Sequence, residues 1–310
     1  MTRDRADPAT LCAAAVTVVL WASAFPAIRA GLDGFSPGGL AVIRFVVASA
    51  AVALLAIRSG IRLPQRPDLG AIAVIGLLGF TAYNLALNQG ERTVTAGSAA
   101  LIVNSVPAIT ALFAAAFLGD RLPRRAWLGI AISFAGVAII TAGEGEGIAA
   151  DPAALLVVLA AVAQAAFFVL QKPYLGRYGP LELTVWAIWA GTLPLLVFTP
   201  TAVSELGVAR SEAIIAAVWL GLFPGAIAYS TWAFALARSD ASRLTTLLYL
   251  VPVVTIGIAY LWLAEVPAAV SVLGGGIAII GVVIVQGTRR RETMASEPRH
   301  EEVRPKGRCP

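Results

Sequence analysis

Long apolar stretches without charge alternate with short polar segments along most of the chain. Charge-free runs cover residues 8–28, 69–90, 93–119, 126–143, 152–171, 183–204, 213–237, 244–264 and 266–288, and a further run at 34–57 is interrupted only by Arg44. A helix needs about 20 apolar residues to cross the hydrocarbon core of a membrane, so these runs have spanning length. The pattern predicts ten transmembrane helices, at about 9–31, 36–57, 69–88, 93–119, 125–142, 152–171, 181–199, 213–236, 242–264 and 267–287.

The second half of the chain repeats the first. Shifting residues 96–139 forward by 145 positions aligns twelve identical residues without a gap, including Pro107 with Pro252. The same shift matches an acid at a helix end in each copy, Asp120 with Glu265. Five spans per copy is an odd number, so the two copies must insert in opposite orientations, as in many secondary transporters. We therefore predict an all-α integral membrane protein in which ten transmembrane helices form two inverted five-helix repeats.

The repeat and the loops between runs divide the chain into four parts. Residues 1–143 form the first five-helix repeat, 144–151 a linker loop, and 152–288 the second repeat. Residues 289–310 are polar and charged, which is typical of a disordered tail.

Composition supports a membrane protein and orients it. The chain is 58% apolar and only 13% charged, which is too little charge to cover a soluble protein of 310 residues. With a cytoplasmic N-terminus, 19 lysine and arginine residues fall on the inner side and three on the outer side: Arg29, Arg92 and Arg210. This asymmetry predicts that both termini are cytoplasmic, and it accounts for the net charge of +5 without a nucleic-acid partner.

The spans lack the residues that most chemistry needs. No histidine lies in any span, and no nucleophile motif, phosphate loop or metal-ligand cluster is present in the sequence, so we expect neither an enzyme nor a cofactor or metal. Glu91, Asp120 and Glu265 lie at helix ends, where capping or tethering of helices is the favoured interpretation for Asp120 and Glu265. Because proton-coupled carriers commonly use buried acids or histidines, we expect uncoupled facilitated diffusion.

Arg44 is the only charged residue deep within a predicted span. It could bind a substrate carboxylate, or it could extend toward the interface or bond backbone carbonyls of neighbouring helices. The other candidates for a substrate site are mid-span amides and aromatic residues, which could line a cavity or fill the core. Together the substrate-binding candidates are Trp21, Arg44, Tyr83, Asn84, Asn104, Gln164, Tyr229 and Tyr249.

Pro107 and Pro252 occupy equivalent points in the fourth and ninth predicted spans. A proline inside a helix removes a backbone hydrogen bond and kinks the helix. Its presence in both repeats predicts a pair of hinges.

Several motifs resemble a known family. Trp21-Ala-Ser-Ala-Phe25 in the first span, Ile43-Arg44-Phe45 in the second, and the paired units ending in Asp120 and Glu265 resemble the drug/metabolite transporter superfamily. Over residues 8–288 the chain is similar to its ten-helix EamA-type exporters, including aromatic or neutral amino-acid exporters of the YddG kind. The resemblance implies an exporter of the bacterial inner membrane that alternates access around a central cavity. It also matches Arg44 to a family arginine, whereas Asp120 departs from the usual glutamate.

These observations favour a transporter that exports small metabolites, with neutral or aromatic amino acids as the expected substrates. A nucleotide-sugar or lipid-linked substrate is the alternative within transporters, and a membrane scaffold or receptor is the alternative outside them. The expected partners are the small-molecule substrate and membrane lipid. The oligomeric state stays open, with a monomer as one option.

Overall fold

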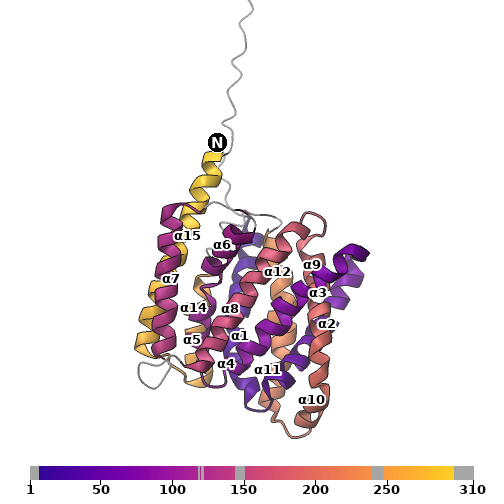
Figure 1. The fold of residues 1–310 in the computed structure, drawn as a ribbon. Helices are drawn as coiled ribbons and strands as arrows, with labels where there is room; N and C mark the ends of the chain where they lie inside the picture. Colours follow the sequence, from indigo (N-terminus) through magenta and orange to yellow (C-terminus); the bar gives the residue numbers. More distant parts are fainter. Residues whose placement is uncertain are drawn as a thin grey trace, which may run out of the picture.

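The computed structural model describes residues 7–117, 119, 122–143, 151–236, 238 and 247–296. All regular structure in these ranges is helical, and the helices form one bundle (Figure 1). The first half contains α1 (Pro8–Leu32), α2 (Pro37–Ser59), η1 (Arg66–Asp68), α3 (Leu69–Gly76), η2 (Leu77–Ala82), α4 (Tyr83–Gly90), α5 (Ala96–Val103), α6 (Val106–Phe117) and α7 (Arg124–Gly143). The second half contains α8 (Pro152–Gln171), η3 (Lys172–Tyr174), α9 (Pro180–Leu195), η4 (Leu196–Phe198), α10 (Thr199–Leu206), α11 (Ser211–Leu222), η5 (Phe223–Ile227), α12 (Ala228–Leu236), α14 (Leu250–Leu263) and α15 (Ala269–Ser296).

Nine helical segments in the described ranges are long and apolar enough to cross a membrane. Several of them are composite, such as Arg66–Gly90, which joins η1, α3, η2 and α4. The remaining predicted span, 242–264, corresponds to the 14-residue helix α14, and its first residues, 242–246, lie outside the described part of the chain. The predicted all-helical membrane fold with ten spans is confirmed.

Short polar residues and prolines set where the helices begin. Asp7, Ser36, Thr95 and Asp151 each cap a helix, because the side chain accepts a hydrogen bond from a backbone N–H in the first turn. Proline follows three of these caps directly and needs no backbone N–H at that position. The helix α2 ends at Gly60, whose φ of 61° is a conformation that favours glycine.

The C-terminal helix is longer than the sequence predicts. We expected the last span to end near residue 287 and a disordered tail to follow from 289, but α15 continues to Ser296 and projects beyond the bundle (Figure 1). Residues 297–310 lie outside the described residues, as do residues 144–150 of the predicted linker.

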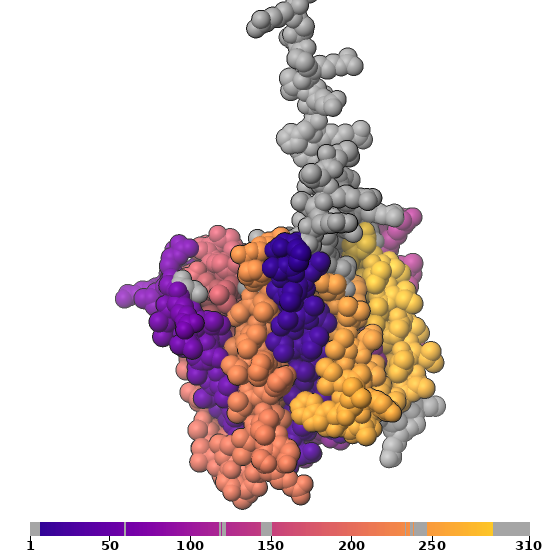
Figure 2. Space-filling view, turned by 180° about the vertical axis from the view of Figure 1, so that it is seen from behind, coloured from indigo at the N-terminus to yellow at the C-terminus, as the bar shows by residue number. Residues whose placement is uncertain are grey.

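The two halves interlock instead of lying apart. The helix α1 of the first half packs against α11, α12 and α14 of the second half. Figure 2 shows α1 in indigo between second-half helices on both sides. Contacts between α2 and both α9 and α11, and between α4 and α8, also join the halves. The centre of the protein is therefore shared between the repeats.

Glycines bring α7 and α15 into backbone contact, because small residues allow two helix backbones to approach closely. A Cβ atom at Gly129 would lie 2.7 Å from the carbonyl oxygen of Gly281, and one at Gly274 would lie 2.8 Å from that of Gly136. The pair lies side by side at one edge of the bundle in Figure 1. This pairing joins the fifth span of one repeat to the fifth span of the other.

The third span of each half contains a π-helical stretch at matching places. These stretches are η2 in the first half and η5 in the second, and a shift of 145 positions carries 77–82 onto 222–227. A π turn accommodates an extra residue and rotates the side chains that follow it, and such turns are common at functional sites. Tyr83 follows η2 directly, and Tyr229 follows η5 after one intervening residue.

The fourth span is broken instead of kinked in its middle. We predicted one helix over 93–119, whereas α5 ends at Val103, Asn104 and Ser105 form a turn, and α6 begins at Val106. Pro107 lies in the first turn of α6, where a missing N–H costs little. In the second half, Leu248 and Tyr249 form the matching turn, and Pro252 lies in the first turn of α14. Both prolines therefore start a half-helix, and their role as hinges stays a prediction.

Candidate functional site

A central cavity of about 170 Å³ lies between the two repeats. Helices α1, α2, α4, α5 and α6 contribute to it from the first half, and α8, α12 and α14 contribute from the second. Six of the eight substrate-binding candidates line this cavity: Trp21, Arg44, Tyr83, Asn104, Gln164 and Tyr229. Pro107 lines it as well. The mid-span polar and aromatic residues are thus gathered at one place by the fold.

Arg44 brings a buried cation to the cavity wall. The residue is 7% exposed, and its Nε and Nη1 atoms have no hydrogen-bond partner among the described residues. Its guanidinium carbon lies 5.3 Å from the ring centre of Phe45. Gly221 allows α11 to pack directly on the backbone of Arg44, since a Cβ there would meet its carbonyl oxygen. A buried cation without an acid partner is costly, so an anionic group that entered the cavity would be bound favourably.

Two amides add hydrogen-bonding groups to the cavity. Gln164 on α8 is 8% exposed and its Oε1 has no hydrogen-bond partner among the described residues. Asn104 lies in the turn between α5 and α6, and its Nδ2 is likewise without a partner there. Buried polar atoms are normally paired, so an acceptor and a donor left open at a cavity are suited to a polar ligand.

Aromatic rings form one side of the cavity. The ring centres of Trp21 and Tyr229 lie 5.4 Å apart in an edge-on arrangement. The ring centres of Trp21 and Trp232 lie 5.5 Å apart. Phe80 in η2 packs on Tyr229 at 5.8 Å. These contacts hold the two cavity aromatics in place and leave an apolar surface beside the polar groups.

Two predicted site residues lie elsewhere. Asn84 is 1% exposed, and its Nδ2 donates a 2.8 Å hydrogen bond to the carbonyl oxygen of Phe80, one turn earlier in the same span. Tyr249 is not among the cavity-lining residues, although its hydroxyl is buried without a partner in the described part of the chain. A substrate-binding role for either residue stays a prediction without support from this geometry.

Much of the cavity wall was missed by sequence reasoning because it is apolar. The additional lining residues are Ala24, Phe25, Ile28, Leu87, Ala100, Val103, Val106, Phe168, Leu248 and Val251. In a chain that is 58% apolar, such residues cannot be distinguished from helix packing. The helix break at Asn104, which Pro107 signals, could have indicated only the two valines that flank it, Val103 and Val106.

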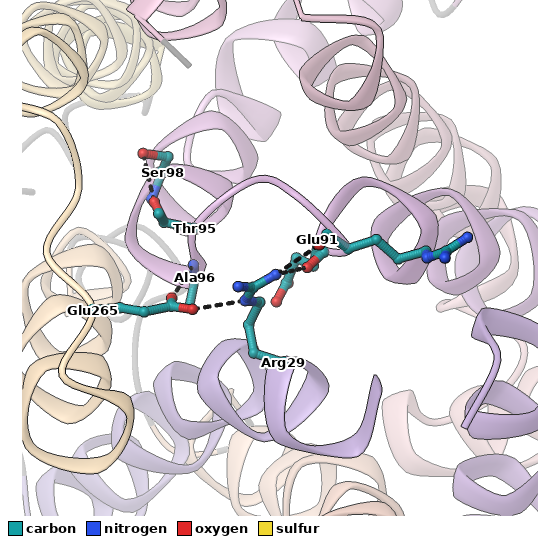
Figure 3. A network of polar contacts seen from close by, with 7 residues as sticks. Arg29, Glu91, Thr95, Ala96, Ser98 and Glu265 are labelled. Atoms are coloured by element: carbon teal, nitrogen blue, oxygen red, sulfur yellow. Dashed lines mark hydrogen bonds and ion pairs between the residues drawn. The ribbon is translucent and has the colours of Figure 1, made fainter. Parts of the chain in front are cut away.

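A polar network joins the repeats at the ends of α1 and α4 (Figure 3). The Nε atom of Arg29 lies 2.7 Å from Oε1 of Glu265, and Nη1 of Arg29 donates to the carbonyl oxygen of Glu91 at 2.6 Å. The other carboxylate oxygen of Glu265 accepts a hydrogen bond from the backbone N–H of Ala96 at 3.2 Å. Glu265 thus makes the tethering contacts expected of a helix-end acid, whereas its counterpart Asp120 lies outside the described residues.

Comparison with known proteins identifies relatives over most of the chain. A probable terminal-alkyne amino-acid exporter from Streptantibioticus cattleyicolor is 42% identical over 286 residues, which is 91% of this chain and 95% of the relative. An uncharacterized transporter of Bacillus subtilis, YdfC, is 39% identical over 263 residues, covering 85% of this chain and 86% of its own. A chain in a solved crystal structure shares the fold with a TM-score of 0.61 at 21% identity, covering 92% of this chain and 98% of that one.

The sequence profile of one family matches both halves separately. Residues 9–142 and 151–286 each correspond to one copy of the profile. The resemblance seen in the sequence is confirmed, and the chain belongs to the EamA-like transporter family of multi-pass membrane proteins.

Proposed function

We propose that this protein exports small neutral or aromatic amino acids across a bacterial plasma membrane by alternating access, with both termini in the cytoplasm. The observation that carries the proposal is the buried guanidinium of Arg44 in a cavity shared by the two repeats, with Nε and Nη1 left without a hydrogen-bond partner among the described residues. A relative at 42% identity is named a probable amino-acid exporter, which agrees with this substrate class.

The groups around the cavity complement an amino acid. The carboxylate would bind to Arg44 and to the Nδ2 donor of Asn104, while the ammonium would donate to Oε1 of Gln164. The side chain would lie against Trp21 and Tyr229. No acid lines the cavity among the described residues, so a lone organic cation would lack a counter-charge there.

The size of the cavity supports an amino acid over the larger substrates considered. Sites for drug-sized ligands have roughly 300–1,000 Å³, whereas this cavity has about 170 Å³. A nucleotide-sugar or lipid-linked substrate would require a much wider opening. A scaffold role would leave the open hydrogen-bonding atoms at the cavity unused, and the named relatives are transporters and not receptors.

The broken spans suggest how access would alternate. The half-helices α6 and α14 begin at the prolines beside the cavity, and backbone at such breaks changes direction more readily than a continuous helix. We infer that α4 and α6 of one repeat move against α12 and α14 of the other. From the sequence we expect this movement to be uncoupled, because no predicted span carries an acid away from its ends.

Counterflow in proteoliposomes tests the proposal. Purified protein in vesicles loaded with unlabelled amino acid should take up labelled neutral or aromatic amino acid from outside, and empty vesicles should not. A panel of neutral, aromatic, acidic and basic amino acids, with a nucleotide sugar as comparison, gives the substrate class. Folded protein that exchanges no amino acid would overturn the proposal.

A further inference from the structure

Glu91 is a fully buried acid that the proposed substrate site does not use. It directly follows α4, its exposed fraction is 0%, and neither carboxylate oxygen has a hydrogen-bond partner among the described residues. A buried ionised carboxylate is strongly unfavourable unless it is paired and hydrogen-bonded. The side chain is therefore best accommodated with a bound proton.

The nearest cation is occupied elsewhere. The guanidinium of Arg29 pairs with Glu265 and donates to the backbone carbonyl oxygens of Glu91 and Arg92 at 2.6 and 3.0 Å, but it makes no bond to the carboxyl group of Glu91 (Figure 3). Arg29 thus lies beside two carboxyl groups and pairs with one of them. If Glu91 lost its proton, its carboxylate would compete with Glu265 for the guanidinium of Arg29.

The other described neighbours of Glu91 do not provide a partner either. Arg44 of α2 is the further cation that acts on it, and Glu265 is an anion that opposes its ionisation. Where α8 meets the end of α4, the contact at Gly90 is with Ala153 and Val157. The acid at the start of α8, Asp151, caps its own helix through a 2.8 Å bond to Ala153. From α5, Thr95 caps that helix and Ala96 bonds Glu265.

Burial raises the pKa of Glu91 well above its usual range, and the nearby carboxylate of Glu265 adds to this, while Arg29 and Arg44 act in the opposite direction. The geometry and the charge balance agree on a neutral carboxyl group in this conformation.

We propose that Glu91 is a proton-binding site and that its proton controls the contact between Arg29 and Glu265. With the proton bound, Arg29 pairs with Glu265 and ties α1 to α5 and to the connection between α14 and α15. When the proton leaves, the Glu91 carboxylate competes for Arg29 and loosens this tie between the repeats.

Combined with the proposed function, on which this step rests, the site makes the carrier a proton antiporter. The tie lies at the end of the bundle that carries Arg29, Arg92 and Glu265, which the charge asymmetry assigns to the outside. A proton taken up from outside closes that end, and its release toward the cytoplasm allows the loaded carrier to open outward. The proton gradient then drives export in place of uncoupled diffusion.

Infrared spectroscopy tests the proton site without any substrate. The purified protein in lipid should show the C=O stretch of a protonated carboxyl group at neutral pH, and the band should be lost in Glu91→Gln. The matched control is Glu182→Gln, because Glu182 is also buried (9% exposed) but accepts a hydrogen bond from the backbone N–H of Arg62. Its variant should keep the band. Absence of a protonated-carboxyl band that depends on Glu91 would overturn the proposal.

Transport measured in the same preparations separates this proposal from the proposed function. Vesicles with an acidic interior should accumulate labelled amino acid above the equilibrium level with the wild-type protein, and only to that level with Glu91→Gln. Wild-type exchange that ignores the pH gradient would contradict proton coupling while the amino-acid carrier stands. If no variant moves any amino acid, the proposed function fails, and the infrared result alone decides whether Glu91 holds a proton.

Discussion

Trp21 of the first repeat and Tyr229 of the second meet edge to face, with their ring centres 5.4 Å apart, on the wall of the central cavity. Trp21 comes from the middle of α1, and Tyr229 follows the π-helical stretch η5. The contact fixes the position of two side chains from opposite halves of the chain. Relative movement of the repeats would therefore alter the surface on which a substrate side chain lies.

Truncating this wall should abolish transport without unfolding the protein. We expect Trp21→Ala, and separately Gln164→Ala, to abolish amino-acid exchange, because each substitution removes a side chain that lines the cavity and would contact the substrate. Trp127→Ala is the control, since Trp127 is 51% exposed, lies near the start of α7 and is not among the cavity-lining residues. Counterflow and thermal melting in detergent give the two readouts. Normal exchange in both cavity variants would remove these residues from the site.

Arg44 should contribute to substrate binding through the planar shape of its guanidinium as well as through its charge. A hydrogen bond to a charged group contributes about 1.5–3 kcal/mol, so Arg44→Ala should weaken substrate binding by roughly 10- to 100-fold. Arg44→Lys should recover only part of this, because an ammonium cannot bind a carboxylate in the two-pronged manner of a guanidinium. Arg58→Ala on the exposed end of α2 is the control. Equal half-saturation concentrations in all three variants would contradict the assignment.

Two glycines of α15 should respond differently to the same substitution. A Cβ at Gly281 would meet the backbone of Gly129 and Ser133 in α7, whereas a Cβ at Gly276 would have nothing within 4 Å. Gly281→Ala should destabilise the protein by about 1–3 kcal/mol through forced separation of the helices. Gly276→Ala should be neutral or stabilise slightly, because alanine favours a helix over glycine. Thermal midpoints of the two variants measure the contrast, and equal midpoints would refute close packing of α7 on α15.

Stability should depend on pH through Glu91. Its pKa in the folded protein is raised by burial, so the folded state keeps a proton that the unfolded state loses above about pH 4.3. Its contribution to stability is complete below that pH and declines as the pH rises toward the raised pKa of the folded state. The wild-type protein should therefore lose thermal stability between acidic and alkaline pH more steeply than Glu91→Gln. Parallel pH profiles would contradict a buried neutral carboxyl group.

The spans were predictable because lipid leaves few alternatives. A backbone inside a bilayer must satisfy its own hydrogen bonds, so runs of apolar residues long enough to cross it give helices. The duplication was visible in the sequence. Six cavity residues were predicted because mid-span polar and aromatic side chains are few, whereas most of the apolar lining was not.

Local irregularities were not predictable in the same way. The π-helical stretches η2 and η5 both contain glycine and phenylalanine, but in different order, and only η5 contains a proline, so no shared motif marks them in the sequence. Pro107 signalled a bend, but whether the helix kinks or breaks depends on packing around Asn104. Glu91 looked like an ordinary helix-end acid. Its complete burial accompanies the packing of α1 and α8 against α4, which one sequence alone does not reveal.

The most direct test of the central claim compares a neutral amino acid with the amine that remains when its carboxylate is removed, as competitors in counterflow. The account predicts that the amino acid competes with the labelled substrate and that the amine does not, because it offers nothing to the guanidinium of Arg44. It further predicts that Arg44→Ala loses this discrimination in whatever exchange remains. Equal competition by the two compounds in the wild-type protein would contradict the account.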